Sequence, residues 1–282
     1  MRNPGHKTAV ATTVLVVLLI WLPFPAPVSG QESPKTSAVD RLNGAYIRNL
    51  GRDFVSVVSS PAKWTTGDLI TFAALAGTGA LLYGFDKDIY DGIQRSKGST
   101  SVGASSVISK LGNGGYLTAF MAALYAGGEV FDEPGLRRTA LLSLESFLTA
   151  SALTLGLKAV AGRARPYAHE SSDSFHPFSF TSRYLSFPSG DAAGAFAVAT
   201  TVAEETPSAA VDVLAYGLAG LVAIYRVHDR KHWPSDVFVG SALGYFVARK
   251  IVRLNRSGSG KNYHVSFQLS ARRQAVTLTV FF

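Results

Sequence analysis

Three separated clusters of residues carry side chains that could bind and transfer a phosphoryl group. The first cluster is Lys158 with Arg165-Pro166. Its two cations share one face if a helix continues between them. Arg165 can donate two parallel hydrogen bonds to phosphate oxygens, and Lys158 adds a point charge. Because a solvated basic helix end would have the same pattern, this pair gains weight only from the other two clusters.

The second cluster is Pro188-Ser189-Gly190-Asp191, which precedes an alanine-rich helical pattern over residues 192–204. Ser189 is a favourable residue for starting a helix, and its hydroxyl and the nearby backbone N–H groups can point at an anion. Gly190 lets a ligand approach the backbone closely. An ordinary capped helix start has the same pattern.

The third cluster is Arg226, His232 and Asp236. Pro234 suits the first turn of the following helix, from which we expect Asp236 to reach back to one imidazole nitrogen of His232. That contact would hold one tautomer and leave the other nitrogen as a nucleophile or base. Arg226 would supply a third cation. A histidine with a positioned carboxylate and two further anion-binding clusters indicates a phosphoryl-transfer site.

Together the clusters resemble the type 2 phosphatidic acid phosphatase superfamily, which also contains vanadium haloperoxidases and bacterial non-specific acid phosphatases. The family's motifs are Lys, six residues, Arg-Pro; then Pro-Ser-Gly-His; then Arg, five residues, His, three residues, Asp. All three occur here in order, with Tyr225 in place of the usual Ser before Arg226 and Asp191 in place of the second-motif His. The resemblance covers roughly residues 60–253 and not the C-terminal segment.

The resemblance implies a metal-independent phosphatase that hydrolyses a phosphomonoester or diphosphate, lipid-linked or not, through a phosphohistidine intermediate. His232 would attack phosphorus and Asp236 would orient it. No metal or cofactor is implied, although vanadate could mimic phosphate, and the partner would be a phosphorylated small molecule or lipid. The phosphate would be bound by Lys158, Arg165, Ser189, Gly190 and Arg226.

Asp191 occupies the place of the proposed general acid. An aspartate beside three cations ionises readily, which opposes proton donation to the leaving group. Three outcomes stay open: substrates with good leaving groups such as pyrophosphates, activity at acid pH with Asp191 protonated, or a weakened or non-catalytic phosphate-binding homologue. A vanadium-dependent haloperoxidase ranks below these. Another histidine could replace the missing acid, and the candidates are His169, His176 and His228.

Apolar and small-residue segments between residues 66 and 253 predict an all-α helical bundle of about six core helices. Alternating apolar residues after residue 262 predict a C-terminal β-hairpin that packs against the bundle or a partner. The domains expected are a signal peptide at 1–30, an N-terminal helical or linker segment at 31–65, the phosphatase-like helical domain at 66–253, and the linker with the hairpin at 254–282. An uncleaved N-terminal anchor is the alternative to the signal peptide.

The composition limits the classes of protein that remain. Hydrophobic residues make up 47% of the chain and charged residues 16%, values that suit a greasy bundle or a membrane protein. The chain has no cysteine, which excludes disulfides and thiolate metal sites. Its basic residues are dispersed, which disfavours nucleic acid as a partner. We expect an exported protein, periplasmic or membrane-associated and facing the periplasm.

Overall fold

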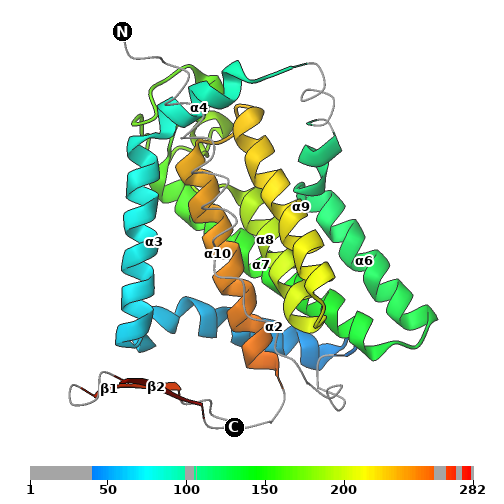
Figure 1. Cartoon of the computed structure of the whole chain (residues 1–282). Helices are drawn as coiled ribbons and strands as arrows, with labels where there is room; N and C mark the ends of the chain where they lie inside the picture. Colours follow the sequence, from blue (N-terminus) through cyan, green and yellow to red (C-terminus); the bar gives the residue numbers. More distant parts are fainter. Residues whose placement is uncertain (1–39, 99–104, 106, 257–264, 271–274, 281–282) are drawn as a thin grey trace.

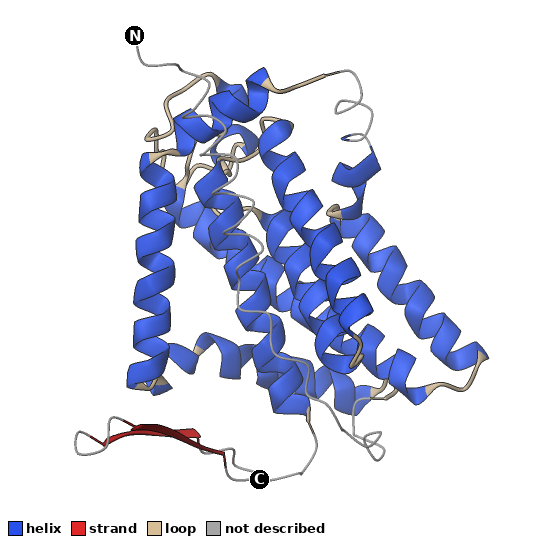
Figure 2. Ribbon diagram, in the orientation of Figure 1, coloured by secondary structure: helices blue, strands red, loops and turns tan. Residues whose placement is uncertain are grey.

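The computed structural model describes residues 40–98, 105, 107–256, 265–270 and 275–280 (Figure 1). The predicted signal peptide and the turn of the predicted hairpin lie outside these residues. Within them the chain is helical apart from two short strands (Figure 2). The prediction of an all-α bundle is therefore confirmed.

Within the described residues, six long α-helices form the bundle, in agreement with the predicted number of about six. Helix α8 lies among α7, α9 and α10 (Figure 1). Alanine is frequent on α8, and because small side chains let helices approach closely, α8 is buried along most of its length. The six helices are α3 (Thr66–Gly84), α6 (Gly114–Val130), α7 (Pro134–Ala161), α8 (Gly190–Glu205), α9 (Ala209–His228) and α10 (Pro234–Asn255).

Shorter helices lie at the two ends of the bundle (Figure 1). Asp86 begins α4, a polar helix that apolar periodicity did not predict. At the opposite end, the Tyr46 hydroxyl of α2 donates to the Leu141 carbonyl at 3.0 Å. Asn255, the last residue of α10, donates to Asp53 of α2 at 2.6 Å. The short helices are α2 (Gly44–Val58), α4 (Asp86–Arg95) and the 3-10 turns η1 (Ser60–Lys63), η2 (Pro166–Ala168) and η3 (Ser182–Tyr184).

Backbone contact between α8 and α10 fixes the end of the bundle that carries the motifs. A Cβ atom on Gly240 would lie 2.3 Å from the Ser189 carbonyl oxygen, and one on Gly244 would lie 2.1 Å from that of Ala193. The Ser189 N–H donates to the Asp236 carbonyl at 2.9 Å. The second and third clusters therefore meet where α8 and α10 begin.

Gly162 ends α7 in the left-handed conformation, with φ of 61°. A Cβ atom there would lie 1.8 Å from the His176 carbonyl oxygen, so both the conformation and the space require glycine. The chain then runs through residues 163–189 over the start of α8. This irregular segment covers the end of the bundle where α7 and α9 finish and α8 and α10 begin.

Strands β1 (Val265–Ser270) and β2 (Ala275–Val280) pair antiparallel, with Val265 opposite Val280. They overlap the two alternating runs of the sequence, but the turn lies outside the described residues and the predicted C-terminal β-hairpin itself is not supported. Packing of a hairpin against the bundle or a partner stays a prediction.

In the described part of the chain, three helices, α3, α7 and α9, are long and apolar enough to cross a membrane. Only 11% of the apolar window of α3 is buried in the bundle. Its outward side chains include Leu69, Ile70, Phe72 and Leu81, all more than half exposed. An apolar helix with this little protein cover is typical of contact with lipid.

We expect Gly244→Ala to destabilise the bundle by about 1–3 kcal/mol, because the new methyl group overlaps the backbone of α8. Thermal unfolding of the detergent-solubilised protein measures the loss. Gly217→Ala on α9 is the matched control, since nothing lies within 4 Å of its Cβ position. Equal unfolding temperatures for the two variants would contradict backbone contact between α8 and α10.

Candidate active site

The segment at Leu185 and Ser186 connects the first and third clusters at one end of the bundle, and the Ser189 N–H joins the second cluster to Asp236 of the third. The Lys158 ammonium donates to the Leu185 carbonyl at 2.7 Å, and Arg165 donates to the same oxygen at 3.2 Å. Nδ1 of His232 lies 2.7 Å from the carbonyl oxygen of Ser186. The sequence clusters therefore form a single site.

His232 is held in one tautomer. A carbonyl oxygen only accepts hydrogen bonds, so Nδ1 must carry the proton that it donates to Ser186. The ring is 2% exposed, and this burial lowers the pKa of His232 to about 3. The charges of Lys158 and Arg165 also lower the pKa, whereas Asp236 raises it. The imidazole is therefore neutral at pH 7, with a lone pair on Nε2. That nitrogen can act as a nucleophile.

Asp236 does not contact His232 in the way the sequence suggested. Its Oδ2 lies 3.9 Å from Nδ1, beyond hydrogen-bond distance. The same oxygen accepts from the Ser186 hydroxyl at 2.5 Å and from the Trp233 N–H at 2.9 Å. The Ser186 carbonyl accepts the hydrogen bond from Nδ1–H instead. Asp236 is therefore connected to the imidazole indirectly, through its hydrogen bond with the Ser186 hydroxyl.

The predicted phosphate-binding residues lie together and have free donor capacity. Nε of Arg165 and Nε of Arg226 are buried and have no hydrogen-bond partner within the described residues. Leaving a buried charged donor unpaired is costly, so both guanidinium groups are suited to an anion. Gly190 faces Lys158, whose Cε would lie 3.6 Å from a Cβ atom there. Ser189 caps α8 by accepting from the Ala192 N–H at 3.4 Å.

Asp191 forms an ion pair with Arg226, with 2.9 Å between Oδ2 and Nη2. Its side chain is 28% exposed, and that of Arg226 is 12% exposed. The carboxylate therefore offsets one of the three cations of the site. This arrangement places a negative charge where the related family has an imidazole.

The three histidines considered as replacement acids have other surroundings. His176 contacts Glu170 at 3.0 Å and stacks on Tyr184. Nδ1 of His228 lies 3.0 Å from Asp229. His169 has a left-handed backbone and lines a separate cavity. Their role as a general acid stays an untested expectation.

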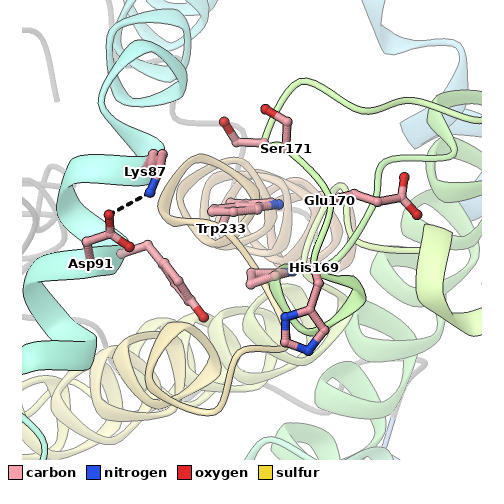
Figure 3. A pocket seen from close by; sticks show the side chains of 9 residues that line it. Lys87, Asp91, His169, Glu170, Ser171 and Trp233 are labelled. Carbon is pink, nitrogen blue, oxygen red and sulfur yellow. Dashed lines mark hydrogen bonds and ion pairs between the residues drawn. The ribbon is translucent and has the colours of Figure 1, made fainter.

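That cavity, of about 420 Å³, lies between α4, the η2 turn and Trp233 (Figure 3). Figure 3 shows Trp233 between the Lys87–Asp91 ion pair of α4 and the segment carrying His169 to Ser171. Pro166 and Trp233 line it, and each directly follows a residue of the site. The Trp233 indole donates to the Ala164 carbonyl at 2.9 Å, which fixes this wall of the cavity.

Sequence reasoning missed Arg163 and Asp86, which lie behind the site. Arg163 donates to Asp86 and to Asp236, each at 2.6 Å, and all three side chains are at most 1% exposed. Asp86 carried no motif signal, because it is the first residue of an unpredicted helix. Arg163 lies within the first family motif but at one of its unspecified positions.

Among the described residues, no group of three or more His, Asp or Glu side chains is arranged to hold a metal ion. The expectation that no cofactor takes part stays a prediction.

Comparison with known proteins agrees with the motifs. Residues 139–257, which contain all three clusters, match the model of the PAP2 superfamily. The resemblance to this superfamily is therefore confirmed over these residues. A Lipid A 1-phosphatase of Porphyromonas gingivalis is 28% identical over an aligned length of 191 positions, and the match covers 63% of this chain. The chain spans 39% of that relative's length.

Two solved structures share the fold. The crystal structure of Aquifex aeolicus LpxE has a TM-score of 0.50 and 21% identity, covering 60% of this chain and 95% of that one. The first transmembrane PAP2 type phosphatidylglycerolphosphate phosphatase from Bacillus subtilis has a TM-score of 0.53 and 22% identity, covering 67% and 98%. At these identities the likeness concerns the arrangement of helices.

We expect Asp191→Asn to tighten binding of vanadate or phosphate by about threefold to tenfold. The substitution removes a carboxylate that competes for Arg226, and partial exposure to solvent limits the gain. Calorimetric titration of the detergent-solubilised protein measures the affinity. Asp212→Asn, near the other end of α9, is the control for a general charge effect, and an equal gain there would refute a local role of the ion pair.

Proposed function

We propose that this chain is a membrane-bound phosphatase that hydrolyses a lipid-linked phosphomonoester or diphosphate through a phosphohistidine on His232. The observation that carries this proposal is the neutral imidazole with Nδ1 bound to the Ser186 carbonyl and Nε2 available. Lys158, Arg165 and Arg226 lie beside it as phosphate ligands. The similarity to a Lipid A 1-phosphatase supports the lipid-linked class of substrate.

The reaction follows from this arrangement in two steps. Nε2 of His232 attacks phosphorus while the bond to the leaving oxygen breaks, and the three cations stabilise charge on the remaining phosphoryl oxygens. Water then attacks the phosphohistidine, releases inorganic phosphate and restores the neutral imidazole. The Ser186 carbonyl accepts the hydrogen bond from Nδ1–H throughout, and Asp236 holds Ser186 in place through the serine hydroxyl.

Asp191 sets which leaving groups the site can expel. Because its carboxylate is paired with Arg226, it is poorly placed to donate a proton. Loss of general-acid help costs about 10²–10⁴-fold for leaving groups that need protonation. We therefore propose substrates whose leaving group is already a weak base, such as diphosphates.

Membrane association is supported by the exposed apolar surfaces of the candidate spans. On α9, for example, Val213 and Leu214 are 68% and 65% exposed. The Bacillus subtilis phosphatase with a similar fold is a transmembrane protein. We propose that residues 66–253 form the phosphatase domain in the membrane. An exported chain whose site faces the periplasm is part of this proposal.

A phosphate-binding homologue without turnover is the second candidate. The ion pair between Asp191 and Arg226 favours this candidate. The residue at the general-acid position is then engaged with Arg226, a proposed phosphate-binding residue, and is not free to donate a proton. Such a protein would bind vanadate or phosphate and release none from any substrate.

We expect His232→Ala to lower the rate of phosphate release by at least about 10³-fold, because the nucleophile is lost. Phosphate release from lipid phosphates and isoprenyl diphosphates in mixed micelles measures activity. A ³²P-labelled substrate tests for acid-labile, base-stable label on the native protein. Asp212→Asn, near the other end of α9, is the control. Native protein that binds vanadate but releases nothing would favour the non-catalytic homologue, and activity that survives His232→Ala would refute the nucleophile.

We expect Asp191→His to raise kcat most on alkyl phosphates, by about tenfold or more, and least on diphosphates and aryl phosphates. Protonation helps a poor leaving group more than a good one. Rates for the native protein, Asp191→His and Asp191→Asn across pH give the comparison. If Asp191→Asn loses activity selectively on alkyl phosphates at acid pH, Asp191 is itself the acid and the proposed preference for good leaving groups is wrong.

A further inference from the structure

The geometry points to Asp86 and Arg163 as positioning residues for His232, acting through Asp236 and Ser186. This inference rests on the proposed phosphatase function. Neither residue touches the phosphate-binding groups in the contacts described. Both belong to a chain of short hydrogen bonds that ends on the imidazole.

Arg163 is the centre of this chain. Its Nη2 donates to Asp86 at 2.6 Å and its Nη1 to Asp236 at 2.6 Å. Nε and Nη2 also donate to the Ser172 carbonyl, at 2.9 and 2.6 Å. The guanidinium lies 4.8 Å from the centre of the Tyr83 ring. These directed contacts leave the side chain one orientation, so it fixes both carboxylates.

Asp86 also holds the start of α10 directly. Its Oδ1 accepts from the Ser235 N–H at 2.8 Å, and its Oδ2 accepts from the Ser235 hydroxyl at 2.6 Å. Ser235 lies three residues after His232 in the sequence. Asp86 therefore ties α4 to the first turn of α10 from behind the site.

Asp236 passes this restraint to the nucleophile. Its Oδ2 accepts from the Ser186 hydroxyl, and the Ser186 carbonyl accepts the Nδ1 proton of His232. A displacement of Asp236 would move Ser186 and with it the acceptor that selects the tautomer. The position of Nε2 thus depends on a link that begins at Asp86.

Stability alone gives a poor account of this arrangement. A buried ion triad costs much desolvation, and apolar replacement of such a triad is often neutral or stabilising, whereas fixing one register is its best-attested use. Burial raises the pKa of Asp86 to about 6 despite Arg163 and the Ser235 hydroxyl, which shows how strongly the site is desolvated. The triad of Asp86, Arg163 and Asp236 therefore positions neighbouring groups at some cost in the free energy of folding.

The first test compares Asp86→Asn with Asp91→Asn on the same helix. Asp91 is 35% exposed in its side chain and paired with Lys87, so its loss removes an equal charge from α4 without touching the triad. We expect Asp86→Asn to lower kcat by about 10–100-fold with KM within about threefold, since misplacing a reacting group by about 1 Å costs on the order of 10²-fold. Asp91→Asn should stay within about twofold of native kcat, because an exposed ion pair contributes little.

Ser186→Ala provides a variant that leaves the fold less disturbed. It removes only the hydroxyl that joins Ser186 to Asp236 and keeps the backbone carbonyl. We expect a loss of kcat of about tenfold, for the same geometric reason. Because both substitutions break one linked chain, the double variant should lose no more than the worse single variant. Losses that multiply would overturn the proposal. If Asp86→Asn does not fold, Ser186→Ala alone decides.

A measurement independent of turnover separates this inference from the proposed function. In ¹⁵N-histidine NMR of the micellar protein, assigned with His232→Gln, native His232 should show a protonated Nδ1 and a bare Nε2. Asp86→Asn and Ser186→Ala should populate both tautomers, and Asp91→Asn should not. Unchanged tautomer and kcat in both variants would overturn the positioning role. Tautomer loss in a protein that releases no phosphate would support positioning while refuting the phosphatase.

Discussion

The close approach of α8 and α10 is the constraint on which the site depends. Gly240 and Gly244 leave α10 without side chains where it meets the backbone of α8. The Ser189 N–H can then donate to the Asp236 carbonyl, which joins the second and third clusters directly. Lys158 of α7 lies against Gly190, so the first cluster joins through the same helix start. Any side chain at these glycines would separate groups that act together.

The balance of charges at this end of the bundle leaves cationic hydrogen-bond donors that suit an anionic ligand. Arg163 is neutralised from behind by Asp86 and Asp236. Arg226 is neutralised in part by Asp191. Lys158 and Arg165 use backbone carbonyls, which are weaker partners for a cation than a carboxylate. The buried Nε atoms of Arg165 and Arg226, unpartnered within the described residues, mark where donors remain for a ligand.

The sequence predicted the bundle and the three clusters because both have short-range signals. Apolar stretches of helical length and fixed spacings such as that of His232 and Asp236 are visible without a structure. The actual partners of Asp236 are not, because Ser186 is 50 residues away and Arg163 is 73 residues away. Spacing alone suggested a direct contact between His232 and Asp236, and only packing shows that Ser186 lies between them. Helix α4 escaped prediction because its amphipathic pattern is short and largely polar.

Asp191 links the affinity and the leaving-group requirement of the site to whether the substrate lies in water or in the membrane. A carboxylate in the first turn of α8 is favourable with the helix dipole and with Arg226, so it stabilises the site without ligand. Under the proposed function, phosphate uses the same helix start and the same arginine, so we expect Asp191 to weaken its binding. A lipid tail offsets this, because its transfer into the bilayer contributes about 0.8 kcal/mol per CH₂ group regardless of the phosphate contacts. Under the proposed function, a lipid-linked substrate with a good leaving group overcomes both effects of Asp191. Insertion of the lipid tail into the membrane compensates for the weaker binding of phosphate, and the good leaving group needs no general acid.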